Sequence, residues 1–131
     1  MHSLAQEIKV SASLLAAVYT ASANGSVVDT LGFDTASVVI STGAIDLVGG
    51  DETYSFKVQE GALADGSDMA DVSGATATVT AANQQKKIAL NGLTTARKRY
   101  LRVVMTQAGA TSSLAVAAPI VLARGYNSPQ A

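Results

Sequence analysis

Apolar and polar residues alternate along much of the chain, most regularly over residues 99–107 and 114–122. An alternation of period two is typical of a half-buried β-strand. Because a short loop containing glycine and serine joins the two runs, they predict an antiparallel hairpin at the centre of the core. Pro119 lies inside the second run and cannot donate a backbone hydrogen bond, so we expect a bulge or an edge position there.

Shorter alternating runs occupy most of the chain between residues 14 and 90. Turn-forming residues separate them at intervals of about 8–12 residues, and no segment has a sustained helical period. The pattern predicts an all-β protein, an antiparallel β-sandwich of jelly-roll type with about eight or nine short strands. The side chains expected to face the core are Ala36, Val38, Ile40, Tyr54, Phe56, Val58, Ala75, Ala77, Val79, Ile88, Leu90, Leu101, Val103, Met105, Leu114, Val116, Ala118, Ile120 and Leu122.

One dipeptide, Asn24-Gly25, is a strong signal for a tight hairpin turn. It predicts that residues 14–21 and residues 27–31 pair as neighbouring strands. The pairing would place the first two strands of the sandwich side by side in one sheet.

The length of 131 residues suits one domain. We expect an N-terminal arm over residues 1–13, a β-sandwich over residues 14–124 and a C-terminal tail over residues 125–131. The arm and the tail are weakly patterned and polar, and we expect them to reach neighbouring subunits.

Bulk composition excludes several classes of protein. The chain has no cysteine, which removes disulfides and thiolate metal sites. Its apolar runs are shorter than the roughly 18 residues of a membrane span, and the N-terminus lacks the pattern of a signal peptide. The net charge of −1 gives no general attraction to nucleic acid.

Charge is unevenly distributed along the chain. Nine of the ten acidic residues lie between Asp29 and Asp71, and six of the nine basic residues lie between Lys86 and Arg102. One interpretation is that each half has its own solvated face. The other is head-to-tail packing of copies, because complementary potentials fix register and the choice of partner.

The densest charged groups are the candidate contacts with other subunits or with a capsid. A nucleic-acid reader interleaves exposed aromatic side chains or supplies a recognition helix, and Tyr100 is the one aromatic residue in the basic group, so we do not expect nucleic acid as a partner. The candidate residues are Arg97, Lys98, Arg99 and Arg102 on the basic side and Asp46, Asp51 and Glu52 on the acidic side.

The sequence offers no catalytic motif, so we expect no enzyme and no cofactor. His2 is the single histidine, and the chain contains neither a G-x-S-x-G motif nor a phosphate-binding loop. The segment from Asp65 to Asp68, with Asp71, is rich in oxygen ligands, but it lacks the spacing and the closing glutamate of a calcium loop. We interpret it as a solvated turn and expect no metal.

Three segments of the chain are informative when taken together. They are Thr20–Asp29 with Gly32–Ala36, Phe56–Glu60 with Asp71-Val72, and Lys98–Val104. In this order they resemble a group of small proteins encoded among the structural genes of tailed bacteriophages and prophages. The resemblance covers most of the chain from Thr20 to Arg124. Where the loop of that group reads DGS-x-W, this chain has Asp68-Met69 and lacks the aromatic residue.

The resemblance implies a virion component, a decoration or cement protein on the outside of the capsid. Such proteins are often compact β-sandwiches that bind as homotrimers, so the expected partners are the major capsid protein and further copies of the chain. The protein would be made in the cytoplasm of the bacterial host and act on the capsid surface. Two alternatives stay open: a head–tail connector or tail component, and a carbohydrate-binding β-sandwich on the virion.

Overall fold

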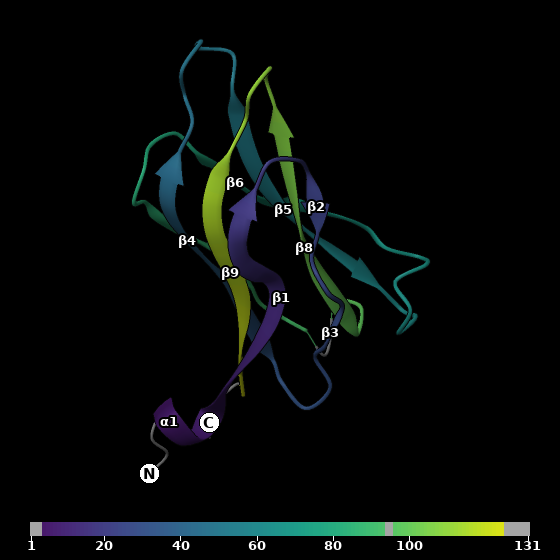
Figure 1. Ribbon diagram of the computed structural model, residues 1–131. Helices are drawn as coiled ribbons and strands as arrows, with labels where there is room; N and C mark the ends of the chain where they lie inside the picture. Colours follow the sequence, from purple (N-terminus) through teal and green to yellow (C-terminus); the bar gives the residue numbers. More distant parts are fainter. Residues whose placement is uncertain (1–3, 94–95, 125–131) are drawn as a thin grey trace.

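The inward-facing side chains of the alternating runs meet between two antiparallel β-sheets (Figure 1). The computed structural model describes residues 4–93 and 96–124. The elements are α1 Leu4–Glu7, β1 Ile8–Tyr19, β2 Ala23–Asn24, β3 Val28–Asp29, β4 Thr35–Ile45, β5 Thr53–Gly61, β6 Ala70–Val79, β7 Gln85–Leu90, β8 Tyr100–Ala108 and β9 Leu114–Ala123.

One sheet has the strand order β1-β9-β4-β7, and the other has the order β2-β8-β5-β6, with β3 also paired to β8. Since β2 and β3 are short and both pair with β8, they act as one interrupted edge strand. Successive strands alternate between the two sheets along most of the chain, so each sheet contains strands from both halves of the sequence. This is the arrangement of a jelly roll. The predicted all-β, antiparallel sandwich is confirmed.

The predicted hairpin over residues 99–122 is wrong. Strand β8 pairs with β5 and with the β2–β3 edge, whereas β9 lies between β1 and β4 in the opposite sheet. Alternation shows only which side chains face the core, and the two sheets share one core. Two successive strands therefore show the same pattern whether they pair in one sheet or lie in opposite sheets. Gly109, in the crossing loop, has a φ of 111°, and a Cβ there would lie 2.8 Å from Cα of Glu52.

The predicted pairing of residues 14–21 with residues 27–31 is also wrong. Residues 14–19 belong to β1 and pair with β9, while β3 pairs with β8 in the other sheet. Gly25 lies where the chain passes close to β1, because a Cβ on it would be 2.7 Å from the backbone carbon of Ser13. The glycine therefore serves a close approach of two segments rather than a tight turn.

The boundary predicted between an arm and the sandwich at residue 13 falls inside β1. Ile8 to Ser11 pair with Ala123 to Ile120, so the sheet begins at Ile8. Residues 1–3 and the predicted tail, 125–131, lie outside the described residues. The register of β1 shifts between Ser11 and Leu14, opposite Pro119, which is the bulge expected from that proline.

The core is built from the side chains predicted to face inward. Ala77 is half-buried, and the other predicted core residues are buried. Burying one large aliphatic or aromatic side chain contributes about 1.5–3 kcal/mol to stability. One hydroxyl group links the two sheets: Ser13 Oγ accepts a hydrogen bond from the Val103 backbone N–H at 3.0 Å and donates one to the Ser26 carbonyl at 2.8 Å.

Candidate functional site

The basic and acidic candidate residues lie at opposite ends of the sandwich. In the pairing of β5 with β8, Gly61 meets Tyr100 at one end and Thr53 meets Ala108 at the other. Arg97, Lys98 and Arg99 precede Tyr100, and we call this the basic end. The loop of residues 46–52 precedes Thr53, at the top in Figure 1, and we call it the acidic tip. Nine-residue strands separate the two by about 27 Å.

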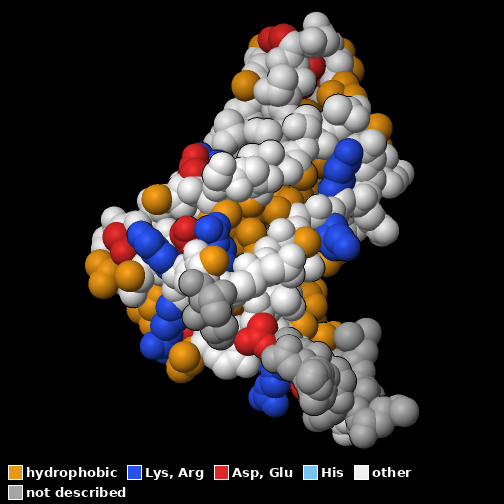
Figure 2. Space-filling view, turned by 180° about the vertical axis from the view of Figure 1, so that it is seen from behind, with side chains coloured by type: hydrophobic (Ala, Val, Ile, Leu, Met, Phe, Trp, Pro, Cys, Tyr) orange, Lys and Arg blue, Asp and Glu red, His pale blue; other side chains and the backbone are white. Residues whose placement is uncertain are grey.

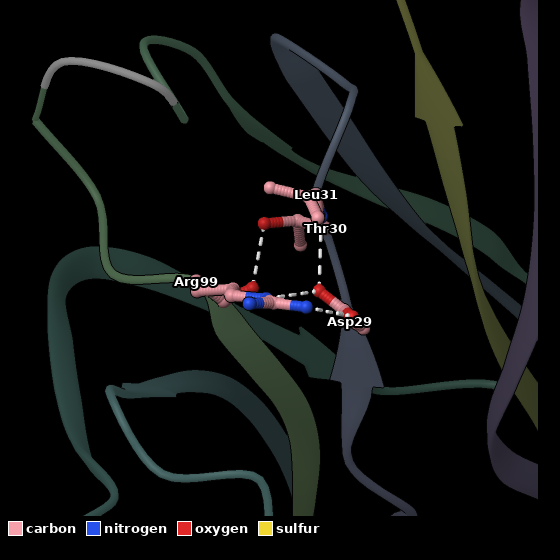
Figure 3. Close-up of polar contacts among 4 residues, drawn as sticks. All are labelled: Asp29, Thr30, Leu31 and Arg99. Atoms are coloured by element: carbon pink, nitrogen blue, oxygen red, sulfur yellow. Dashed lines mark hydrogen bonds and ion pairs between the residues drawn. The ribbon is translucent and has the colours of Figure 1, made fainter.

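At the basic end, Arg99 and Asp29 form a two-pronged ion pair (Figure 3). Arg99 Nε donates to Asp29 Oδ1 and Nη2 donates to Oδ2, both at 2.8 Å. The Arg99 guanidinium also lies 5.1 Å from the centre of the Tyr100 ring. The hydrogen bond from Arg99 outweighs the effect of desolvation, which raises the pKa, and together with the Leu31 backbone N–H and the charge of Arg99 it holds the pKa of Asp29 at about 2. The pair joins β3 to the start of β8.

The residues that follow β3 are tied to the same arginine. Thr30 donates to the Arg99 carbonyl twice, from its backbone N–H at 3.0 Å and from Oγ1 at 2.6 Å. The Leu31 backbone N–H donates to Asp29 Oδ1 at 3.0 Å (Figure 3). These bonds turn the chain sharply after Asp29 and leave the Leu31 side chain 68% exposed.

Beside this ion pair lies a hollow of about 320 Å³, lined by Thr30, Leu31, Gly32, Phe33, Leu93, Arg97 and Arg99. Leu93 is buried and Phe33 is half-buried, so the lining is largely apolar with arginines among it. The guanidinium of Arg124 lies 5.9 Å from the centre of the Phe33 ring and adds a third arginine. Such a hollow suits an apolar side chain flanked by carboxylates.

The structure brings three of the four basic candidates together and places the fourth elsewhere. Glu60 Oε1 accepts a hydrogen bond from the Lys98 backbone N–H at 2.9 Å and lies 3.7 Å from Arg97 Nε. Arg102, in β8, donates from Nε to Gln59 Oε1 at 2.9 Å. Arg102 does not line the hollow. Arg102 lies beside the β5–β6 loop, because a Cβ on Gly66 would be 3.7 Å from Arg102 Nη1. On the rear of the molecule, Figure 2 shows acidic and basic side chains intermixed.

The acidic tip presents an apolar point between carboxylates. Asp46 Oδ1 accepts a hydrogen bond from the Val48 backbone N–H at 2.9 Å, and the Gly50 backbone N–H donates to the Leu47 carbonyl at 3.3 Å. Gly49 and Gly50 have φ values of 108° and 79°, which only glycine adopts readily. The turn leaves Val48 82% exposed and Leu47 41% exposed.

Glu52 differs from the other acidic candidates. It is 8% exposed, and its Oε1 has no hydrogen-bond partner among the described residues. Its side chain packs against Gly49 of the acidic tip and against Gly109 of the β8–β9 loop. Asp51, by contrast, is exposed. Of the three acidic candidates, Asp46 and Asp51 are therefore available to a partner, and Glu52 is not.

The carboxylates of the β5–β6 loop hold the loop itself. Asp68 accepts hydrogen bonds from the backbone N–H groups of Ala62 and Leu63, and Asp65 accepts one from Ser67. These bonds lower the pKa of both carboxyl groups. No group of three or more metal-ligating side chains is present within residues 4–93 and 96–124. His2 lies outside these ranges.

A further surface was not identified from the sequence. Strand β9 directs Ala115, Ala117, Pro119 and Val121 away from the core, toward the outside of its sheet. The charged residues of the four strands are Lys9, Lys86 and Lys87, all on the edge strands β1 and β7. We call this surface of β1, β9, β4 and β7 the outer sheet face. The sequence does contain a signal for the outer sheet face, because small residues alternate with large ones along β9.

The chain matches no protein-family model, and no curated protein matches it significantly. Among the described residues, no helix has both the length and the apolar character to cross a membrane.

Proposed function

We propose that this protein is a structural component of a tailed-phage virion, a decoration protein that binds the outside of the head and stabilises it. The major capsid protein would be its partner, and several copies would associate on the shell. The resemblance of residues 20–124 to small phage structural proteins supports this setting. The jelly-roll fold is compatible with it but hosts many unrelated functions, so the surface has to carry the argument.

The observation that carries the proposal is the outer sheet face. Its central strands, β9 and β4, contain no charged residue. Four adjacent strands of about ten residues span roughly 600 Å², most of the roughly 800 Å² that each partner contributes to a stable protein–protein interface. A broad surface of small side chains, with charged residues on its edge strands alone, can approach another protein closely and desolvate few charges. It fits a flat protein shell better than it fits a small ligand.

Stabilisation of the head would follow from mass action. A protein that binds the assembled shell but not its dissociated subunits stabilises the shell in proportion to the logarithm of its free concentration over its dissociation constant. This mechanism needs no catalytic group and no cofactor. It needs a contact surface that is present before binding, and a rigid sheet supplies one.

The experiment is incubation of the purified protein with heads that lack it, followed by measurement of bound copies and of the melting temperature of the shell. We expect a copy number comparable with that of the capsid subunit and a higher melting temperature. A few copies confined to one vertex would favour the connector alternative. Failure to bind heads, combined with binding on a glycan array, would replace the proposal with the carbohydrate-binding alternative.

A further inference from the structure

The acidic tip and the hollow at the basic end are complementary, yet they cannot meet within one copy of the chain. They lie at opposite ends of nine-residue strands, about 27 Å apart. Any contact between them therefore joins two molecules. A surface that binds a different surface on the next copy builds a closed ring, an open chain or, where the contact forms reciprocally, a two-fold dimer.

The tip is shaped before any partner arrives. The hydrogen bond from the Val48 backbone N–H to Asp46 and the turn closed by Gly50 fix the loop, and Val48 projects from it at 82% exposure. Asp46 and Asp51 flank the apolar point on both sides in sequence. A preformed apolar point loses little conformational entropy on binding.

The hollow offers what such a tip requires. Leu31, Phe33 and Leu93 supply apolar lining, and Arg97 and Arg99 supply positive charge. The volume of about 320 Å³ is ample for a valine side chain with its neighbouring backbone. Hydrogen bonds within the ion pair of Arg99 and Asp29 hold this wall in place.

Charge complementarity selects a second copy of this chain as the occupant. The acidic tip offers a partner two carboxylates, Asp46 and Asp51, and no basic residue, whereas three arginines, Arg97, Arg99 and Arg124, surround the hollow and its Phe33. Complementary charges around an apolar centre guide the approach and exclude other registers.

We propose that the acidic tip of one copy seats in the hollow of the next copy, with Val48 against Leu31 and Phe33 and the tip carboxylates facing the arginines. The contact joins two different surfaces, so the copies close as a two-fold dimer when both tips seat reciprocally, and otherwise they build a ring or an open chain. The inference deepens the proposed function and takes its biological setting from it.

Cysteine crosslinking tests the contact directly, because the chain contains no cysteine of its own. Full-length Val48→Cys and Leu31→Cys proteins are prepared separately, mixed, and exposed to a mild oxidant. We expect the mixture to form a covalent dimer in high yield. Each variant alone should form little, because a head-to-tail contact brings position 48 against position 31 and not against itself.

The matched control is Leu63→Cys mixed with Leu31→Cys. Leu63 is an exposed leucine, 50% accessible, in a different loop. We expect this mixture to give background yield. Efficient dimers of Val48→Cys with itself would overturn the proposal in favour of a contact between two tips, and equal yields from both mixtures would overturn it as well.

Light scattering on cysteine-free protein provides a second readout. Val48→Ser should weaken self-association by about tenfold or more, whereas Leu63→Ser should not. Association should also weaken at about 1 M salt, where the Debye length falls to about 3 Å. A protein that stays monomeric at all concentrations yet binds heads would overturn this contact while leaving the proposed function intact.

Discussion

Two glycines show how the surroundings of a residue decide what it tolerates. A Cβ on Gly25 would lie 2.7 Å from the backbone carbon of Ser13, and neighbouring backbone cannot move aside. A Cβ on Gly43 would meet the Ala115 Cβ at 3.5 Å, an ordinary contact. Neither residue needs a left-handed backbone, so the difference is one of space alone.

We therefore expect Gly25→Ala to lower the free energy of unfolding by about 1–3 kcal/mol, as overpacked sites do. Gly43→Ala should change it by less than about 0.5 kcal/mol, as substitutions away from special sites do. Urea unfolding followed by circular dichroism measures both. Equal effects of the two substitutions would show that β1 does not approach residue 25 as closely as the structure has it.

The ion pair of Asp29 with Arg99 predicts a dependence of stability on pH. The pKa of Asp29 is lowered from 3.8 to about 2 in the folded protein. A lowered pKa means that the pair contributes stability above the unfolded pKa and loses it as pH falls through the folded value. Because both side chains are nearly half exposed, we expect a contribution of about 0.2–1 kcal/mol.

Asp29→Asn should thus lower the free energy of unfolding at pH 7 by that amount, and the difference from the unmodified protein should vanish near pH 2. Urea titrations at several pH values between these limits measure the effect. Asp51→Asn, at an exposed carboxylate of the acidic tip, is the control and should have little effect at either pH. A difference for Asp29→Asn that persists at pH 2 would contradict the assignment.

At the scale of elements, β1 is a strand that connects the two sheets. Its first part, Ile8 to Ser11, pairs with β9, and Ser13 links it to β8 in the opposite sheet. The strand is also an edge, and its register shifts twice along its length. Irregular edge strands are poor templates for pairing with other chains.

Truncation should separate the role of β1 from that of the residues before it. A chain that begins at Ile8 should keep the fold, whereas a chain that begins at Leu14 should lose at least about 2 kcal/mol, because the buried Val103 N–H loses its partner and β9 loses a neighbour. Thermal unfolding of both chains measures the difference. If both truncations behaved alike, residues 8–13 would be an arm, as the sequence pattern suggested.

The elements also show what sequence patterns can and cannot predict here. The period-two alternation identified the buried faces of β4, β5, β7, β8 and β9, since burial on one face imposes that period. It failed to pair β8 and β9, because strands facing one core from opposite sides carry the same pattern. The bulge opposite Pro119 was predictable, since a missing N–H has one local consequence.

The candidate site was predictable in part for a similar reason. The basic and acidic groups stand out as clusters along the chain, so Arg97, Lys98, Arg99, Asp46 and Asp51 could be found. The hollow could not be found, because Leu31 and Phe33 follow β3 whereas Leu93 follows β7, and only the fold brings these two loops together. The ion pair of Arg99 with Asp29 spans 70 residues and leaves no local signal.

At the scale of the whole molecule, the two proposed contacts use different parts of the surface. The outer sheet face would bind the capsid, and the acidic tip and the hollow at the basic end would bind other copies. A charge placed on the outer sheet face should therefore abolish binding to heads while leaving the fold and the self-association intact. Ala117→Glu is the test, because Ala117 faces outward from the central strand β9.

Thr78→Glu is the matched control, because Thr78 is exposed on β6 in the opposite sheet. We expect Ala117→Glu to reduce occupancy on heads by about tenfold or more, as a buried unpaired charge costs several kcal/mol. Quantitative gel analysis of purified heads measures it. Equal occupancy for both variants would place the capsid contact elsewhere on the surface.

The central place of β9 has a consequence for how the protein comes into being. Ile8 pairs with Ala123, and β4 also pairs with β9, so neither β1 nor β4 has its shared neighbour until translation has passed residue 123. The nascent chain must therefore carry β1 unpaired, and β4 paired only with β7, until β9 has been made. Folds rich in pairings between residues far apart in the sequence form slowly, and they expose hydrophobic surface until they are complete. A growing chain of this kind is a natural client for ribosome-associated chaperones, and its yield in a cell should depend on their supply.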